Sequence, residues 1–329
     1  MPEIYGTLGP RCSDPETLCA MFDAGMSGVR LNLSHITIHD AALQIKNLQS
    51  AALKCGKSAQ LLIDMQGPEL RIGGLEHPLP LAEGEEVTFG GHGIPVPEMI
   101  LPCLVPGQQI LLDDGKLLLE TLSGDGRTAR AFVLRGGVLQ SRKSVALPGC
   151  ALRPPTMTET DLLNLSLAAE YGVTGVMQPF VRDRADLEAV RAALDRAGGE
   201  HIRLFAKIEN REGVEHLDEL IGACDEIVIA RGDLGNAMPL WELPRVQKEI
   251  AAKCREAGKP FMVVTQMLAS MEHSAVPTRA EVSDVFNAVC DGAASVMLTG
   301  ETAVGDYPLE AIRYLANTAQ EALRYLGKA

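Results

Sequence analysis

Short apolar runs recur eight times along the chain, and segments with helical periodicity separate them. The runs occupy residues 4–7, 28–32, 60–64, 175–177, 203–207, 226–230, 261–265 and 294–299. Short, mostly apolar runs are typical of strands buried on both faces of a parallel sheet. Because parallel strands need a crossover connection, the intervening segments are expected to be helices packed against the sheet.

The segments between the runs carry helix signals. Asp14 followed by Pro15 is a capped helix start, and Gly25 is a stop signal. Apolar residues at 187, 190 and 194, and at 282, 285, 286 and 289, have the spacing of helices with one buried face. Eight alternations of strand and helix predict an α/β fold, the TIM (β/α)8 barrel.

One stretch, residues 73–147, interrupts the alternation. It is rich in Gly and Pro and contains short β-type runs at 86–89, 109–112, 117–120 and 129–133. We interpret it as a small β-domain inserted after the third barrel strand, so that residues 1–72 and 148–329 form the barrel. The alternative is a long irregular loop, but about 75 residues without regular structure are unusual in a compact protein.

The charge balance restricts the partners. The chain has 30 Lys and Arg and 43 Asp and Glu, a net charge of −13, whereas a general nucleic-acid binder needs a broad basic surface. No apolar run approaches the length of a membrane span, and the first residues lack the pattern of a signal peptide. We expect neither a nucleic-acid partner nor a membrane segment. A small anionic ligand would need local positive charge.

The eight cysteines form no Cys-x-x-Cys pair, and no histidine cluster has the spacing of a zinc site. Their dispersal along the chain is typical of reduced thiols in a protein core. This pattern predicts a cytoplasmic location.

Polar residues stand at or just after the ends of most runs. In a TIM barrel the carboxyl ends of the strands form the mouth of the active site. A single charged residue in a strand is ordinarily a surface or capping residue, but several strands contributing to one rim favour a site. The residues are Arg30, Asn32, Ser34, Asp64, Lys207, Glu209, Arg231, Asp233, Thr265, Thr299 and Glu301.

The residue types indicate a chemistry. Glu209 and Asp233 are hard oxygen ligands on neighbouring strands and suit Mg²⁺. Lys207 is two residues before Glu209, so both side chains face the same way and the ammonium can neutralise a phosphoryl group in transfer. Arg30 can form a forked contact with a phosphate. The sequence contains neither GxxxxGK[ST] nor GxGxxG, which argues against a P-loop or a Rossmann nucleotide site.

Ten motifs, in order along the chain, resemble those of the pyruvate kinase family, and together they span nearly the whole sequence. They are TLGP (7–10), RLNLSH (30–35), DMQGPELR (64–71), LDDG (112–115), LPG (147–149), AKIEN (206–210), ARGDLG (230–235), TQMLASM (265–271), PTRAEVSDV (277–285) and MLTGETA (297–303). The resemblance implies a barrel with an inserted β-domain lid. It also implies transfer of the phosphoryl group of phosphoenolpyruvate to ADP, which gives pyruvate and ATP in glycolysis.

By motif match, the resemblance assigns the reacting groups. Lys207 would stabilise the transferring phosphoryl group, Arg30 would contact the phosphate, and Glu209 and Asp233 would hold Mg²⁺ or Mn²⁺. Thr265 would lie beside the enolate carbon. The residues placed against the substrate would be Ala230, Arg231, Gly232 and Asp233, and those of a water-linked proton path would be Thr299 and Glu301.

The resemblance also assigns the remaining ligands. A potassium site would use Asn32, Ser34, Asp64 and the Met65 carbonyl. The positions near the ADP or ATP nucleotide would be Pro10, Asn32, His35, Arg71 and Lys143. Asp114, in the lid, would close over the metal and phosphates.

Glu69 bears on the monovalent cation. In the Gly-Pro-Glu form of its motif, the carboxylate adds an anionic charge beside the monovalent site, so Glu69 predicts dependence on K⁺ by charge balance. The alternative is a structural salt bridge between Glu69 and Arg71.

Some features depart from the family pattern. The sequence ends after a helix predicted at 308–326, so the C-terminal regulatory domain of the family is expected to be absent, with its effector site. A homo-oligomer would then not use the interface of that domain. Near the site, Ile36 replaces Gly, Pro179 replaces Ser, and Asn236 and Ala237 replace Val and Glu. These changes are either neutral or alter the substrate or acceptor.

Two other classes of function remain open. A metal-dependent lyase or aldolase acting on the pyruvate enolate could use such a barrel, but enolate chemistry without phosphate has no need of Lys207, Asp114 or the lid. A non-catalytic sensor of phosphoenolpyruvate or nucleotide is the other alternative. The presence of Lys207, Glu209, Asp233, Thr265 and Arg30 argues against it, because a protein without activity has no need to keep them all.

Overall fold

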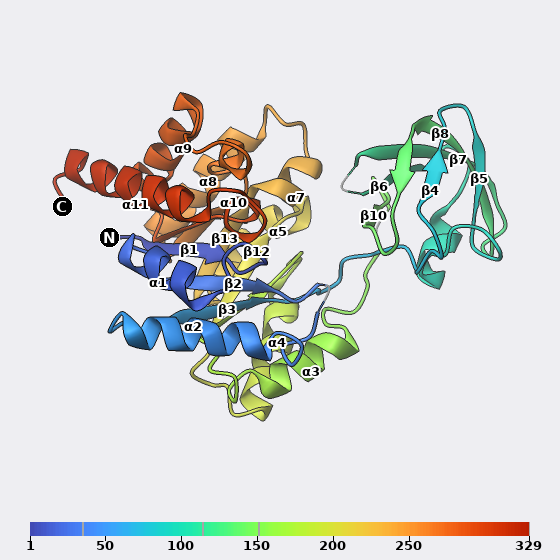
Figure 1. Cartoon of the computed structure of the whole chain (residues 1–329). Helices are drawn as coiled ribbons and strands as arrows, with labels where there is room; N and C mark the ends of the chain where they lie inside the picture. Colours follow the sequence, from blue (N-terminus) through green and yellow to red (C-terminus); the bar gives the residue numbers. More distant parts are fainter. Residues whose placement is uncertain (35, 114, 151, 329) are drawn as a thin grey trace. The chain divides into compact units, whose positions relative to one another are not determined.

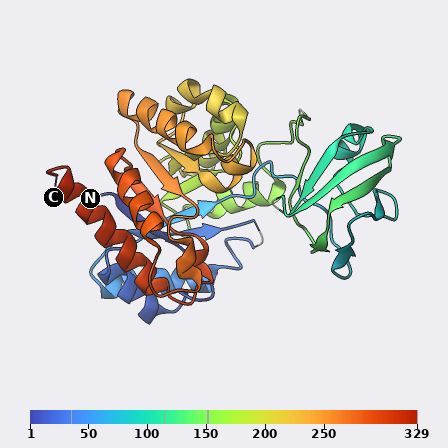
Figure 2. The same ribbon diagram turned by 90° about the horizontal axis from the view of Figure 1, so that it is seen from above.

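The computed structural model describes residues 1–34, 36–113, 115–150 and 152–328 (Figures 1 and 2). The chain divides into two compact units. One is formed by Met1–Gly67 with Thr156–Ala329, and the other by Pro68–Pro155. The second unit therefore extends beyond the stretch 73–147 that the Gly- and Pro-rich composition marks out.

The first unit is a closed barrel of parallel strands, eight in the described part of the chain, so the predicted TIM fold is confirmed. Its strands follow one another around the barrel in sequence order, and β1 pairs with both β2 and β15. The strands are β1 (Glu3–Thr7), β2 (Gly28–Asn32), β3 (Gln60–Asp64), β11 (Gly175–Gln178), β12 (Arg203–Ile208), β13 (Glu226–Ala230), β14 (Phe261–Val264) and β15 (Ser295–Met297).

Helices surround the strands of this unit, and side-chain caps fix several of their starts (Figure 1). Asp14 caps α1 by accepting from the backbone of Glu16 and Thr17, as the Asp-Pro signal predicts. The helices are α1 (Pro15–Asp23), α2 (Ala42–Lys54), α3 (Glu159–Leu167), α4 (Arg184–Arg196), α5 (Arg211–Glu215), α6 (Leu217–Ile221), α7 (Arg231–Asn236), α8 (Leu243–Glu256), α9 (Arg279–Cys290), α10 (Gly300–Ala303) and α11 (Pro308–Tyr325), with a 3₁₀ turn η2 (Ala269–Glu272). Within the four described ranges, no helix combines the length and apolarity needed to cross a membrane.

The second unit is built from antiparallel strands around its own apolar core, so the inserted β-domain of the predicted fold is also present. Its main sheet has the order β10-β6-β7-β8-β5, and a separate pair is formed by β4 and β9. Phe89, Ile110, Leu119 and Val133 are fully buried between these elements. The elements are β4 (Leu79–Leu81), β5 (Glu86–Phe89), η1 (Glu98–Cys103), β6 (Gln109–Leu112), β7 (Leu117–Gly124), β8 (Ala129–Arg135), β9 (Gly137–Leu139) and β10 (Val145–Ala146).

The barrel interior has an apolar middle that separates polar groups at its two ends. Nine buried residues form an apolar cluster distinct from the larger core shared by strands and helices. Because side chains alternate along a strand, the residues flanking this cluster on the same face lie at the strand ends. On β12, Phe205 belongs to the cluster, Arg203 precedes it and Lys207 follows it. The cluster consists of Tyr5, Leu62, Met177, Phe205, Val228, Ala230, Met262, Val264 and Met297.

A hydrogen-bonded network fills the amino-terminal end of the barrel, where each participant except Tyr5 is the first residue of its strand. Glu226 is fully buried, and its carboxylate accepts from the Arg203 guanidinium and the Ser295 hydroxyl. Glu3 pairs with Arg203 at 3.2 Å and accepts from the Tyr5 hydroxyl at 2.8 Å. Burial raises the pKa of Glu226 to about 7, although Ser295 and Arg203 act in the opposite direction.

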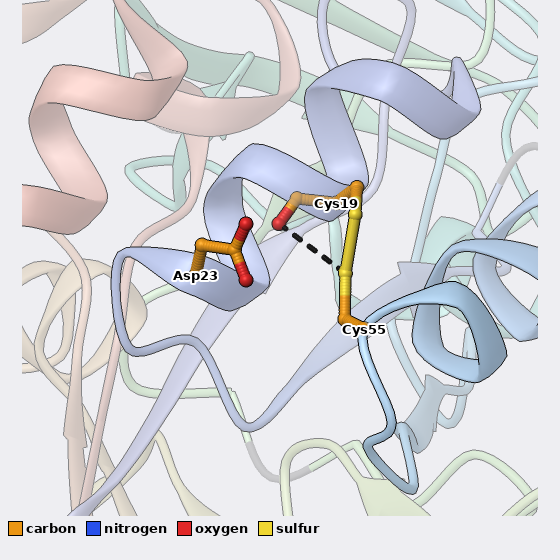
Figure 3. Close-up of side chains that lie close together, drawn as sticks. All are labelled: Cys19, Asp23 and Cys55. Atoms are coloured by element: carbon orange, nitrogen blue, oxygen red, sulfur yellow. Dashed lines mark hydrogen bonds between the residues drawn. A yellow bond between two sulfur atoms is a disulfide. The ribbon is translucent and has the colours of Figure 1, made fainter.

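A disulfide joins α1 to the residue that follows α2, through Cys19 and Cys55 (Figure 3). The expectation that all eight cysteines are reduced is therefore wrong for this pair, because two residues far apart in sequence become neighbours only in the folded barrel. An oxygen of the exposed Asp23 lies within 4.8 Å of both sulfurs. Sulfurs bonded to each other are not thiolates, so Cys19, Cys55 and Asp23 do not together offer a metal ion a set of thiolate ligands.

Cys12 is a buried free cysteine. Its burial raises the pKa of the thiol to about 11.

The raised pKa of Glu226 predicts a pH-dependent stability. Since the folded state binds a proton more tightly than the unfolded chain, the contribution of Glu226 is complete below about pH 4.5 and is lost as the pH rises through about 7. Glu226→Gln cannot lose a proton. The free energy of unfolding of this variant, minus that of the unchanged chain, should therefore increase by about 2 kcal/mol between pH 5 and pH 8.

Urea denaturation at several pH values measures this difference. Glu200→Gln, which removes an exposed carboxylate before β12, is the matched control. If the curves of Glu226→Gln and the unchanged chain stay parallel from pH 5 to pH 8, burial of Glu226 does not govern its titration.

Candidate functional site

The carboxyl ends of β2, β3 and β12 bring together four charged side chains of the predicted site. Lys207 lies with its ammonium 3.0 Å from Asp64 Oδ2 and 3.0 Å from Glu209 Oε1. Arg30 donates from Nε to Asp64 Oδ2 at 2.8 Å, and its Nη2 lies 2.7 Å from the same oxygen. Asp64 is thus held between two cations, and the predicted meeting of these strand ends is what the structure shows.

Burial and pairing set the charge state of this cluster. Burial alone would raise the pKa of Asp64, but Lys207 and Arg30 hold it below its ordinary value. Burial alone would lower the pKa of Lys207, but the carboxylates of Asp64 and Glu209 raise it above its ordinary value. Lys207 therefore stays an ammonium and Asp64 a carboxylate, so fixed charges stand directly above the apolar middle of the barrel.

Glu209 is the member of the cluster that is short of positive charge. Burial raises its pKa to about 7, and Asp233 and Asp64 add to this effect while Lys207 opposes it. Glu209 Oε2 accepts from the backbone N–H of Phe180 at 2.8 Å. A divalent cation between Glu209 and Asp233 would supply the missing charge, and carboxylate oxygens are the ligands that Mg²⁺ prefers. The donor set therefore fits Mg²⁺ or Mn²⁺.

The chain leaving β14 has an unusual backbone. Thr265 and the next residue, Gln266, both have positive φ, at 77° and 54°, which L-residues rarely adopt. Glycine is needed opposite, because a Cβ on Gly232 would lie 2.9 Å from Thr265 Cγ2. The Arg231 side chain donates to the Thr265 carbonyl from Nε at 3.1 Å and from Nη2 at 2.7 Å. The guanidinium of Arg231 is thus engaged with backbone next to Thr265.

Glu301, in α10, holds the same segment. Its buried carboxylate accepts from the backbone of Leu268 at 3.1 Å and from the backbone of Thr299 at 2.7 Å. The Thr299 hydroxyl donates to Glu301 at 3.3 Å. The structure therefore brings Thr299 and Glu301 together and joins Glu301 to Leu268, three residues beyond Thr265.

The residues of the expected potassium site come from the ends of β2 and β3, which are paired strands. Asn32 stands opposite Asp64 in the strand register. Asn32 Oδ1 accepts from the Ser34 backbone at 3.1 Å, and Met65 is buried directly after Asp64. Both Asp64 oxygens also accept from Lys207, a link that sequence spacing does not reveal.

The inserted unit contains two of the residues expected near the nucleotide. Arg71 and Lys143 lie on neighbouring segments, since the backbone of Ile72 donates to the Lys143 carbonyl at 2.9 Å. Lys143 pairs with Asp113 at 2.8 Å, and Arg71 pairs with Glu69 at 2.6 Å. The salt bridge between Glu69 and Arg71, the alternative to a role of Glu69 at the potassium site, is therefore present. Arg71 balances the negative charge of Glu69. His35 and Asp114 lie outside the described residues.

The structure shows what surrounds three of the positions that depart from the family pattern. Pro179 lies against Gly67, where an added Cβ would be 2.5 Å from the proline ring. The Ala237 carbonyl, just past α7, accepts from Arg211 at 3.0 Å. Ile36 is exposed. Pro10, which is expected near the nucleotide, is also exposed.

Two contributions to the site could not be read from the sequence. The N–H of Phe180 reaches Glu209 because Phe180 has a positive φ of 51°, and no residue type in this segment signals that conformation. Asp284, on α9, forms an ion pair of 2.6 Å with Arg231. Asp284 belongs to one of the recognised motifs, so its presence is visible in the sequence but its partner is not.

The double pairing of Asp64 predicts a large stability effect. Asp64→Asn leaves Arg30 and Lys207 buried with less opposite charge, so the free energy of unfolding in metal-free buffer should fall by about 3 kcal/mol. Asp306→Asn removes one partner of the exposed pair with Arg11 and should cost less than about 1 kcal/mol. Chemical denaturation compares the two variants. Equal losses of unfolding free energy in the two variants would contradict the prediction that the buried double pairing of Asp64 stabilises the fold.

Comparison with known proteins gives consistent matches over this fold and site. The family model described as "Pyruvate kinase, barrel domain" matches residues 2–312. A pyruvate kinase of Geobacillus stearothermophilus is 38% identical over 96% of this chain and 56% of the relative. One of Mycobacterium intracellulare is 38% identical over 95% of this chain and 68% of the relative, and one of Agrobacterium vitis is 40% identical over 95% and 66%.

The chain spans somewhat more than half the length of the first two relatives, 56% and 58%. The match runs through the strands that carry Arg30, Asp64 and Lys207, and through Glu209 directly after β12. On the extent of the family match and the identity to these relatives, the chain belongs to the pyruvate kinase family.

Proposed function

We propose that this protein transfers the phosphoryl group of phosphoenolpyruvate to ADP, giving pyruvate and ATP. The observation that carries the proposal is the Lys207 ammonium, fixed 3.0 Å from both Asp64 and Glu209 at the barrel mouth. A cation held rigidly in a buried site stabilises charge that develops on a transferring phosphoryl group without having to reorganise. Family membership adds a chemical precedent for this arrangement.

The residues around Lys207 suit the binding of the substrate. Arg30, anchored by Asp64, would direct its remaining N–H groups to the phosphate. The backbone of Ala230, Arg231, Gly232 and Asp233 at the exit of β13 would lie along the carboxylate. Thr265 would lie beside the carbon that becomes the methyl group of pyruvate, and Glu301 with Thr299 would connect that carbon to a source of protons.

Metal ions and nucleotide complete the proposal. Glu209 and Asp233 would hold Mg²⁺ or Mn²⁺, which supplies positive charge to the substrate oxygens. The proposed potassium ligands are Asn32, Ser34, Asp64 and the Met65 carbonyl. By motif match, the groups proposed for ADP or ATP are Pro10, Asn32, His35, Arg71 and Lys143, and the same match assigns Asp114 to the phosphates.

The remaining partners are inferred from composition and family. A net charge of −13 argues against nucleic-acid partners, and the absence of a long apolar run in the sequence argues against a membrane partner. The pyruvate kinase relatives support a cytoplasmic enzyme. We also propose that this chain associates with copies of itself into a homo-oligomer. The exposed side chains of Leu240 and Trp241, just before α8, are apolar surface that such contacts would cover.

The function is tested by pyruvate formation from phosphoenolpyruvate, ADP, Mg²⁺ and K⁺. Formation that requires ADP is expected, and Lys207→Met should reduce the rate about a thousand-fold because the fixed ammonium is lost. Lys54→Met, on the exposed face of α2, should leave the rate unchanged. Pyruvate turnover only with an aldehyde would identify a lyase, and binding without turnover would identify a sensor; either result overturns the proposal.

The cation requirement is a separate prediction. With Mg²⁺ present, replacing K⁺ by tetramethylammonium should reduce the rate at least ten-fold, since the oxygens of Asn32, Ser34 and Met65 would lack their ion. Initial rates at constant ionic strength measure the effect. A full rate without K⁺ would remove the monovalent site from the proposal while leaving phosphoryl transfer intact.

A further inference from the structure

The segment Thr265–Leu268 leaves β14 in a conformation that needs external support. Two consecutive non-glycine residues, Thr265 and Gln266, have left-handed φ values. Each such residue costs free energy relative to the right-handed regions, so the conformation persists only where the surroundings hold it. The support must come from contacts outside the segment. The Glu301 carboxylate holds the Leu268 backbone, and the Arg231 guanidinium holds the carbonyls of Thr265 and Gln266.

The Arg231 side chain is one support. It is mostly buried, and one guanidinium donates to the carbonyls of Thr265 and Gln266, with distances of 2.7 and 3.1 Å from Nη2. Nη2 also lies 3.0 Å from Met267 Sδ. A planar guanidinium can reach three neighbouring acceptors at once, which a lysine ammonium in the same place does less well. The side chain of Arg231 thus serves the β14 exit.

Asp284 supports the segment indirectly, because it holds Arg231. Its Oδ2 accepts from Arg231 Nη1 at 2.6 Å, on the side of the guanidinium away from Thr265. The start of α9 also holds the residues that follow, since Glu281 accepts from the backbone and hydroxyl of Ser270. The turn after β14 is therefore tied to the first turns of α9.

We propose that Asp284 and Arg231 are a positioning pair for Thr265. Asp284 fixes the guanidinium, and the guanidinium fixes the left-handed backbone of Thr265 against Gly232. The inference rests on the proposed function for its consequence: the pair aligns Thr265 with the enolate carbon. Loss of the pair should therefore affect the step at that carbon more than the binding of the phosphate, which Arg30 and Lys207 carry.

Two variants test the pair with nearly unchanged shape. Asp284→Asn removes the charge that holds Arg231, and Arg231→Lys removes the fork. In either variant kcat should fall ten- to a hundred-fold, while KM for phosphoenolpyruvate changes less than three-fold. Asp284→Glu should restore part of kcat. The double variant should be no slower than the slower single variant, because both changes break one chain of contacts.

A partial reaction isolates the carbon step. Exchange of the pyruvate methyl hydrogens in D₂O, followed by proton NMR, needs no phosphoryl transfer and should slow in Asp284→Asn by the same factor as kcat. The control is Glu249→Gln, which breaks the exposed pair with Arg245 on α8 and should leave kcat and exchange unchanged.

A structural measurement keeps the test independent of activity. Amide hydrogen exchange of the region 262–271, followed by mass spectrometry on the free protein, should accelerate at least ten-fold in Asp284→Asn and remain unchanged in Glu249→Gln. Unchanged exchange in Asp284→Asn overturns the positioning pair, whether or not the protein is active. Accelerated exchange in a protein that forms no pyruvate supports the pair and overturns the proposed function. Accelerated amide exchange in Asp284→Asn with a normal kcat would overturn the claim that the pair aligns Thr265 with the enolate carbon.

Discussion

The buried contact of Lys207 with Asp64 is the interaction on which the site depends. An ammonium and a carboxylate inside a barrel are costly to desolvate, and they are tolerated here because each has a second partner. Arg30 completes the charge on Asp64, and Glu209 lies beside Lys207. The same contacts that make burial possible fix the direction of both cations. Stability and the geometry of the barrel mouth are thus set by one group of charges.

The apolar middle of the barrel is what keeps this group distinct from the polar network at the other end. Phe205 separates Lys207 from Arg203 on a single strand, and the nine-residue cluster fills the interior at that level. The two ends can therefore have different roles. Glu226 and its partners satisfy buried polar groups around the strand starts, whereas Glu209 at the mouth remains short of positive charge.

The barrel, and the placement of charged residues at its strand ends, could be predicted from local patterns. The run 28–32 and the strand β2 coincide, and α1 starts at Pro15 as its cap predicts. These patterns succeed because strand burial and helix capping depend on neighbouring residues. The pairing of Cys19 with Cys55 was missed, and so was the side-chain direction of Arg231. Both depend on segments that approach one another only after the chain has folded.

The sequence by itself determined the alternation of strands and helices, the insertion of a β-domain, and the residue types at the strand ends. Only the tertiary structure decided which of those residues share a charge. It placed Asp64 between Arg30 and Lys207, paired Glu69 with Arg71, and supported Thr265 from Arg231 and Asp284. The physical reason is that a hydrogen bond forms only when donor and acceptor approach within about 3.5 Å, and an ion pair weakens as its charges separate. Distances on that scale are set by barrel closure and not by spacing along the chain.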